Sequence, residues 1–99
     1  MFQNFTGTQL VTADGVVGTS GKPVRIFSIH ILSGAGGGAV VNLRSGTAVG
    51  GTIRIKETGT VDTGKTFDYG KYGYLFEAGC FCDVDANTTS VAVQFEKEV

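Results

Sequence analysis

Two stretches near the end of the sequence alternate their side chains with a period of two residues. In residues 80–84, one side of the chain carries Cys80, Cys82 and Val84. In residues 91–95, after a polar turn, one side carries Val91, Val93 and Phe95. A period of two is the repeat of a β-strand with one buried face, whereas a helix repeats every 3.6 residues. The two stretches therefore predict a pair of strands joined by a turn.

The rest of the chain continues this pattern between glycine-rich turns. Glycines punctuate the sequence about every ten residues, which is the spacing of turns in an all-β sandwich or barrel. Further strands are expected over residues 2–11, 24–32, 39–44, 52–57, 66–69 and 74–76. No segment of useful length has helical periodicity. The predicted fold is all-β, a two-layer antiparallel, jelly-roll-like β-sandwich of roughly seven or eight short strands with no significant helix.

The length bounds the organisation of the chain. We expect 99 residues to form a single β-sandwich domain over residues 1–99. A domain of this size has only a thin core, so association with a partner would add to its stability. Segments 1–8 and 94–99 are predicted as possible terminal arms, because a terminal strand can pair with the sheet edge of a neighbouring subunit.

The predicted strand over residues 24–32 is apolar on both sides. If Phe27, Ile29 and Ile31 point into the core, the opposite side carries Val24, Ile26, Ser28, His30 and Leu32. Such a strand is either central and covered, or in contact with another subunit. The candidate contact residues are therefore Val24, Ile26, His30 and Leu32, and we add two tyrosines from a Gly- and Tyr-rich segment, Tyr72 and Tyr74.

The charge distribution argues against two large classes of function. The formal net charge is −1, and the 8 basic and 9 acidic residues are scattered along the chain. A nucleic-acid interface needs clustered Lys and Arg, and a membrane-spanning helix needs about 20 consecutive apolar residues. The first residues also lack the basic region and apolar run of a signal peptide. We expect no nucleic-acid partner, no membrane partner, and synthesis in a cytoplasm.

Two glycine-rich motifs resemble nucleotide-binding loops. Residues 59–66 (GTVDTGKT) match the phosphate-binding pattern GxxxxGK[ST], which needs a helix directly after it. The sequence that follows, FDYGKYGY, is a poor helix former. Residues 34–39 (GAGGGA) fit a dinucleotide fingerprint but continue into the strand-like VVNLR. Both motifs are therefore interpreted as loops, and no cofactor is expected.

Asp83, Asp85 and Asn87 present oxygen ligands at alternate positions, as at the start of a calcium-binding loop. Such a loop needs Gly at its sixth position and Glu at its twelfth, where this sequence has Thr88 and Gln94. The simpler interpretation is strand alternation running into an Asn-containing turn. A loosely bound cation between loops or subunits stays open as the alternative.

No set of catalytic residues is identifiable. Cys80 and Cys82 share one side of a strand, where a disulfide between them would be strained, and they are expected to be free, buried thiols. His30 is the only histidine. No Ser or Cys has a recognisable general base with a group to orient it. We expect no catalytic residue and no enzyme activity.

Several segments together carry a resemblance: residues 24–32 (VRIFSIHIL), 40–46 (VVNLRSG), 50–55 (GGTIRI), 64–70 (GKTFDYG) and 75–87 (LFEAGCFCDVDAN). Their order of strands, turns and glycines, from about Val24 to Phe95, resembles small β-sandwich structural proteins of tailed bacteriophages. The resemblance implies a non-enzymatic virion component, with capsid decoration (cement) protein as the leading role. It transfers no individual binding residue.

That role implies partners and a location. A decoration protein bridges and stabilises subunits of the major capsid protein, so the expected partners are the major capsid protein or other virion proteins, and the expected location is the virion. A closed homo-oligomer is expected, with a trimer as the first expectation. Two alternatives stay open: a low-copy neck, tail or fibre-attachment component, and a carbohydrate-binding module whose aromatic platform would need Tyr69, Tyr72 and Tyr74.

Overall fold

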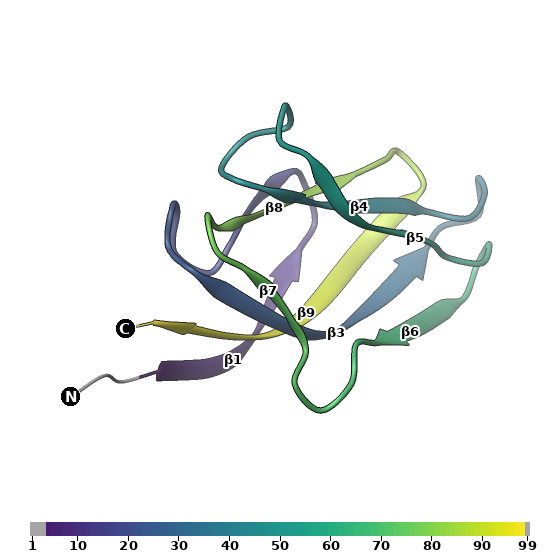
Figure 1. The fold of residues 1–99 in the computed structure, drawn as a ribbon. Coiled ribbons are helices and arrows are strands. Elements are labelled where there is room, and N and C mark those ends of the chain that lie inside the picture. Colours follow the sequence, from purple (N-terminus) through teal and green to yellow (C-terminus); the bar gives the residue numbers. More distant parts are fainter. Residues whose placement is uncertain (1–3, 99) are drawn as a thin grey trace.

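The computed structural model describes residues 4–98 of the chain (Figure 1). Over these residues the structure is all-β, and no helix that could cross a membrane is present in them. The strands are β1 (Asn4–Val11), β2 (Gly15–Val17), β3 (Val24–Ser33), β4 (Val40–Ser45), β5 (Ile53–Thr58), β6 (Gly64–Asp68), β7 (Tyr74–Phe76), β8 (Cys80–Val84) and β9 (Thr88–Glu98). The predicted strands are all found, most of them within about two residues at each end, whereas the one expected over 91–95 extends over 88–98. The short β2 lies between residues 11 and 24, where no strand was expected.

The strands form two antiparallel sheets with the order of a jelly roll. Sheet A has the order β1-β9-β3-β6, with β7 also paired to β3, and sheet B has the order β2-β8-β4-β5. The first strand pairs with the last, β2 with β8, β3 with β6 and β7, and β4 with β5. This nesting is the pattern of one long antiparallel ribbon wrapped into two layers. The predicted β-sandwich is therefore confirmed.

The core lies between the two sheets and is built from the inward side of each strand. Sheet A supplies Val11, Val24, Ile26, Ile29, Ile31, Phe76, Val91, Val93 and Phe95. Sheet B supplies Val17, Val41, Leu43, Cys80 and Cys82. Because every second residue of a strand points inward, the opposite set of side chains forms the two outer faces of the molecule.

A β-bulge at Phe27 interrupts the alternation of β3. In the ladder with β9, Ile26 is opposite Phe95 and Ser28 is opposite Gln94, which leaves Phe27 as an extra residue. A bulge of this kind shifts the phase of the strand, so that the residues after it point to the opposite side from the one that strict alternation predicts. Phe27 itself is only half-buried instead of lying in the core.

The bulge overturns part of the predicted contact surface. Val24 and Ile26 are 1% and 0% exposed and lie in the core, as does Ile29 after the bulge. The prediction that Val24 and Ile26 share an outer side with His30 and Leu32 is therefore wrong. Of the four strand residues proposed as contacts, only His30 and Leu32 lie at the surface.

The described parts of the two terminal segments pair with each other instead of projecting as arms. Asn4 is opposite Glu98 and Thr8 is opposite Gln94 in the β1–β9 ladder, which runs along one side of the sandwich (Figure 1). The predicted arms over 4–8 and 94–98 are therefore part of sheet A. Residues 1–3 and 99 of those segments lie outside the described residues.

Candidate interaction surface

The central part of the outer face of sheet A carries no charged side chains, and Asp68, Arg25 and Glu96 lie at its border. One cross-strand row runs from Leu10 through Ala92 and His30 to Thr66. The rows on either side of it contribute further polar or small residues, and the row through Ser28 ends at the charged Asp68 on β6. We define outer face A as Thr8, Leu10, Ser28, His30, Leu32, Gly64, Thr66, Ser90, Ala92 and Gln94. The set contains no Asp, Glu, Lys or Arg, although its residues come from four different strands.

Two leucines on outer face A stand out from its small polar residues. Leu10 is 66% exposed and Leu32 is 39% exposed. Single exposed leucines are common on protein surfaces, so their exposure alone carries little weight. The uncharged surroundings of the two leucines are a stronger indication of a contact surface, because the centres of protein interfaces are depleted of charged residues.

Hydrogen bonds join polar side chains of outer face A across neighbouring strands. His30 Nδ1 and Thr66 Oγ1 are 2.8 Å apart, and Ser28 Oγ donates to Gln94 Oε1 at 2.9 Å. The His30 ring also lies over Gly64, where an added Cβ would come within 2.6 Å of Nε2. These contacts order the face without another chain, which lowers the entropy that docking would cost.

Of the residues of outer face A, sequence reasoning selected His30 and Leu32 and missed Leu10. The missed signal is the alternation of Thr6, Thr8 and Leu10, which puts Leu10 among polar residues on the exposed side of β1. An apolar residue in a polar row is the pattern that indicates a contact surface.

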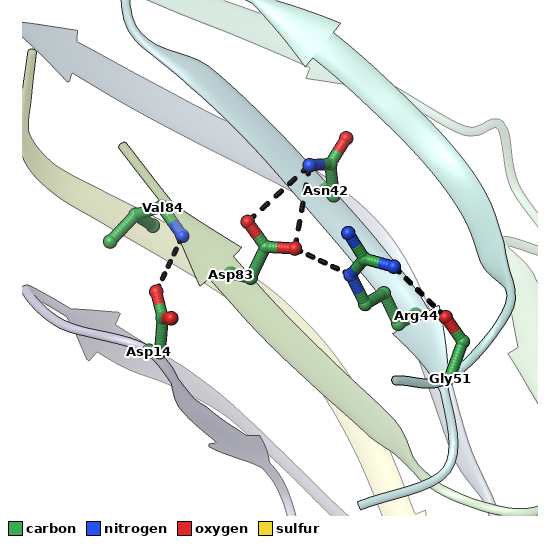
Figure 2. A network of polar contacts seen from close by, with 6 residues as sticks. All are labelled: Asp14, Asn42, Arg44, Gly51, Asp83 and Val84. Carbon is green, nitrogen blue, oxygen red and sulfur yellow. Dashed lines mark hydrogen bonds and ion pairs between the residues drawn. The ribbon is translucent and has the colours of Figure 1, made fainter. Parts of the chain in front are cut away.

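The outer face of sheet B is charged, and residues of β4 and β8 on it pair with one another (Figure 2). Asp83 forms an ion pair with Arg44 and accepts hydrogen bonds from Asn42 Nδ2 at 3.3 and 3.4 Å. Arg44 Nη1 also donates to the carbonyl oxygen of Gly51 at 3.0 Å, which ties the β4–β5 loop to the sheet. These charged groups therefore serve the fold by joining β8, β4 and the loop.

The three residues weighed as a cation site have separate partners. Asp83 is engaged by Arg44 and Asn42, whereas Asp85 Oδ1 accepts hydrogen bonds from Asn87 N at 3.1 Å and Thr88 Oγ1 at 3.0 Å. No group of three or more His, Cys, Asp or Glu side chains able to hold a metal occurs in residues 4–98. The arrangement is a strand ending in an Asx-type turn, so the structure does not assemble the candidate cation site.

Both cysteines are buried, free thiols on the inner side of β8. Burial raises the pKa of the Cys80 thiol to about 12, and that of Cys82 to about 12 as well, with smaller contributions from neighbouring acidic groups. A thiol that is neutral and shielded from solvent is a poor nucleophile and a poor metal ligand. Their role is to fill the core.

The tyrosines occupy three different environments and do not share one platform. The Tyr69 hydroxyl donates to Glu57 Oε2 at 3.0 Å and its ring packs against the core. The Tyr74 ring packs on Phe76 with centroids 5.0 Å apart, and Tyr74 is 38% exposed. Tyr72 is 75% exposed and lies beside Lys71. Tyr72 and Tyr74 remain candidate contacts, at the end of the sandwich near the β6–β7 turn.

Comparisons with known proteins give one informative similarity. No family model and no curated protein matches this sequence. Among solved structures, the chain is similar to one described as "Bacillus endospore appendages form a novel family of disulfide-linked pili", with a TM-score of 0.56 and 10% identical residues. The similarity covers 100% of this chain and 90% of the other. At this identity it shows the fold alone.

Proposed function

We propose that this chain is a non-enzymatic structural subunit that attaches in many copies to a protein shell, and that its role is decoration of a tailed-phage capsid. The phage assignment is supported by the resemblance in the order of strands and turns. Outer face A is the proposed contact with the shell, and the major capsid protein is the proposed partner. Each copy would bridge neighbouring shell subunits and stabilise the assembled lattice, because it binds that lattice and not the free subunits.

The observation that carries this proposal is the difference between the two outer faces. Outer face A lacks charge, carries exposed Leu10 and Leu32, and is ordered by its own hydrogen bonds. On the opposite side of the sandwich, Asp83 and Arg44 are already paired with each other. A surface without charge can be desolvated at low cost, which suits repeated packing against a protein lattice.

The similar solved structure is compatible with a role in a repetitive assembly, since it is described as a component of pili. The disulfide linkage described for those pili does not carry over. Both cysteines of this sequence, Cys80 and Cys82, are in the core and out of reach of another subunit. Contacts between this chain and its partners are therefore proposed to be non-covalent.

The first experiment is to measure copy number in purified particles by quantitative mass spectrometry, relative to the major capsid protein. We expect a ratio commensurate with icosahedral symmetry. A dozen or so copies would instead place the chain at the neck or tail, and absence from particles would overturn the virion role.

A binding experiment tests the contact surface. Purified chain is added to particles that lack it, and bound protein is measured by co-sedimentation for Leu32→Lys and for the matched variant Ile53→Lys. Leu32 on outer face A and Ile53 on the edge strand of sheet B have similar exposure, 39% and 42%. We expect Leu32→Lys to lose binding by about tenfold or more and Ile53→Lys to retain it. Equal binding by the two variants would contradict the assignment of outer face A.

A further inference from the structure

The four outermost positions of the two sheets differ in how well they are protected from pairing with another strand. β2 has only 3 residues. β5 carries Arg54, Lys56 and Glu57, and its ladder with β4 is irregular. The other edge of sheet A is divided between β6, which carries Lys65, and the 3-residue β7. Short length, charge and irregularity are the devices that keep edge strands from pairing with other chains.

β1 has none of these protections. It is 8 residues long, its sequence NFTGTQLV contains neither a charged residue nor a proline, and its ladder with β9 is regular. Among the described residues β9 is its only strand partner, because β1 lies at the end of sheet A. Every second residue of such a strand directs its N–H and C=O groups away from the sheet, where they can only meet water or another strand.

We propose that β1 is a self-association edge, at which two copies of this chain pair β1 with β1 in antiparallel fashion around a two-fold axis. The chemistry of the edge requires an extended strand as the occupant, since only a strand satisfies a row of alternating donors and acceptors. Of the strands described in this chain, only β1 is unprotected enough to serve. A two-fold axis brings the same strand from each copy together.

The side chains of β1 favour this pairing. No charged residue lies on the strand, so no like charges are brought opposite each other. Thr6, Thr8 and Leu10 are exposed on its outer side and would form cross-strand pairs in the dimer. The two copies of sheet A then form one continuous sheet, and the two copies of outer face A become one larger surface without charge. The inference does not depend on the proposed function, because it concerns the chain by itself.

The first test is a cysteine scan of β1. Thr6→Cys, Thr8→Cys and Leu10→Cys are oxidised singly and in pairwise mixtures, and disulfide dimers are measured on non-reducing gels. The native cysteines do not interfere, because both are buried. Val61→Cys is the matched control, since Val61 is 45% exposed in the β5–β6 loop. We expect one β1 position or one pair of positions to cross-link much faster than Val61→Cys, because antiparallel pairing fixes which residues are opposite each other.

The second test uses the unaltered chain, so it does not rely on any variant folding. Sedimentation velocity gives its association over a concentration series, and hydrogen exchange gives the protection of β1 amides over the same series. We expect dimers to form with concentration and β1 amides to gain protection in parallel. The proposal would be overturned if the chain stayed monomeric at all concentrations. It would also be overturned if the chain associated while the hydrogen-exchange rates of the β1 amides stayed the same. If the β1 amides gained protection from exchange only when shell particles were present, the proposal of self-association would also be overturned. The partner of the β1 edge would then be a strand of the shell protein.

Discussion

Asp83 on β8 and Arg44 on β4 face each other across the outer side of sheet B, and their side chains are only 16% and 19% exposed (Figure 2). Partial burial makes such a pair more sensitive to the loss of one partner than an exposed ion pair, because the remaining charge is left partly desolvated. The pair also holds the loop that follows β4, through the Arg44 bond to Gly51.

Asp83→Asn is therefore expected to lower the free energy of unfolding by about 1–2 kcal/mol. The measurement is urea unfolding of Asp83→Asn, Arg44→Met and the double variant. The double-mutant cycle should give a coupling energy of about 0.5–2 kcal/mol. Glu77→Gln, at an exposed position, is the control for loss of a carboxylate. Additive effects of the two single substitutions would show that the pair contributes nothing to stability.

Gly50 and Gly51 are adjacent in the β4–β5 loop but differ sharply in available space. A Cβ on Gly51 would lie 2.0 Å from the carbonyl oxygen of Ser45, whereas a Cβ on Gly50 would meet nothing within 4 Å. We expect Gly51→Ala to destabilise the protein by about 2–4 kcal/mol, because the neighbour is backbone and cannot move aside easily. Gly50→Ala should be neutral or stabilising by up to about 1 kcal/mol. Thermal unfolding of both variants checks this, and similar melting temperatures would contradict it.

The fold could be predicted because the information for it is local. Alternating side chains and glycine turns mark most strands, and a chain of short strands between turns has few stable arrangements. The phase of β3 was the main error. The polar residues Arg25, Ser28 and His30 cannot all lie on one side of a regular strand, and this was the signal for a bulge at Phe27.

The candidate surface was less predictable, because it depends on strand order. Leu10, Ala92, His30 and Thr66 form one row only after β1, β9, β3 and β6 have taken their places in sheet A. Pairing between strands far apart in sequence is set by tertiary packing and not by local pattern. The ion pair between Asp83 and Arg44 likewise depends on the pairing of β8 with β4. Because Asp83 is engaged in that pair, it does not contribute to the candidate cation site.

The two thiols should make stability depend on pH in the alkaline range. Burial raises the pKa of Cys80 and of Cys82 from 9.0 to about 12 in the folded chain. Between these values the unfolded chain loses protons that the folded chain keeps, so the free energy of unfolding falls as pH rises from about 9 to 12. Below pH 9 both states are protonated and the thiols cause no pH dependence.

Cys80→Ala/Cys82→Ala should therefore be less stable at neutral pH but lose less stability on going to alkaline pH. Chemical denaturation at neutral pH and at about pH 10.5 measures the difference. A parallel measurement is the rate of alkylation by iodoacetamide, which we expect to follow the rate of unfolding because neither thiol is accessible in the folded state. Rapid alkylation of the folded protein would show that the thiols are not shielded as the structure indicates.

Tyr69 and Tyr72 provide a matched test of a partly buried and an exposed hydroxyl. Burial raises the pKa of Tyr69 well above its usual range, and the nearby Glu57 carboxylate adds to the effect while accepting the hydroxyl proton in a hydrogen bond. Tyr69→Phe removes that bond and is expected to cost about 1–2 kcal/mol of unfolding free energy, because the acceptor is charged and partly buried. Tyr72→Phe should change stability by less than about 0.5 kcal/mol, since Tyr72 is 75% exposed. Urea unfolding at neutral pH compares the two, and equal losses would show that the Tyr69–Glu57 bond does not stabilise the sandwich.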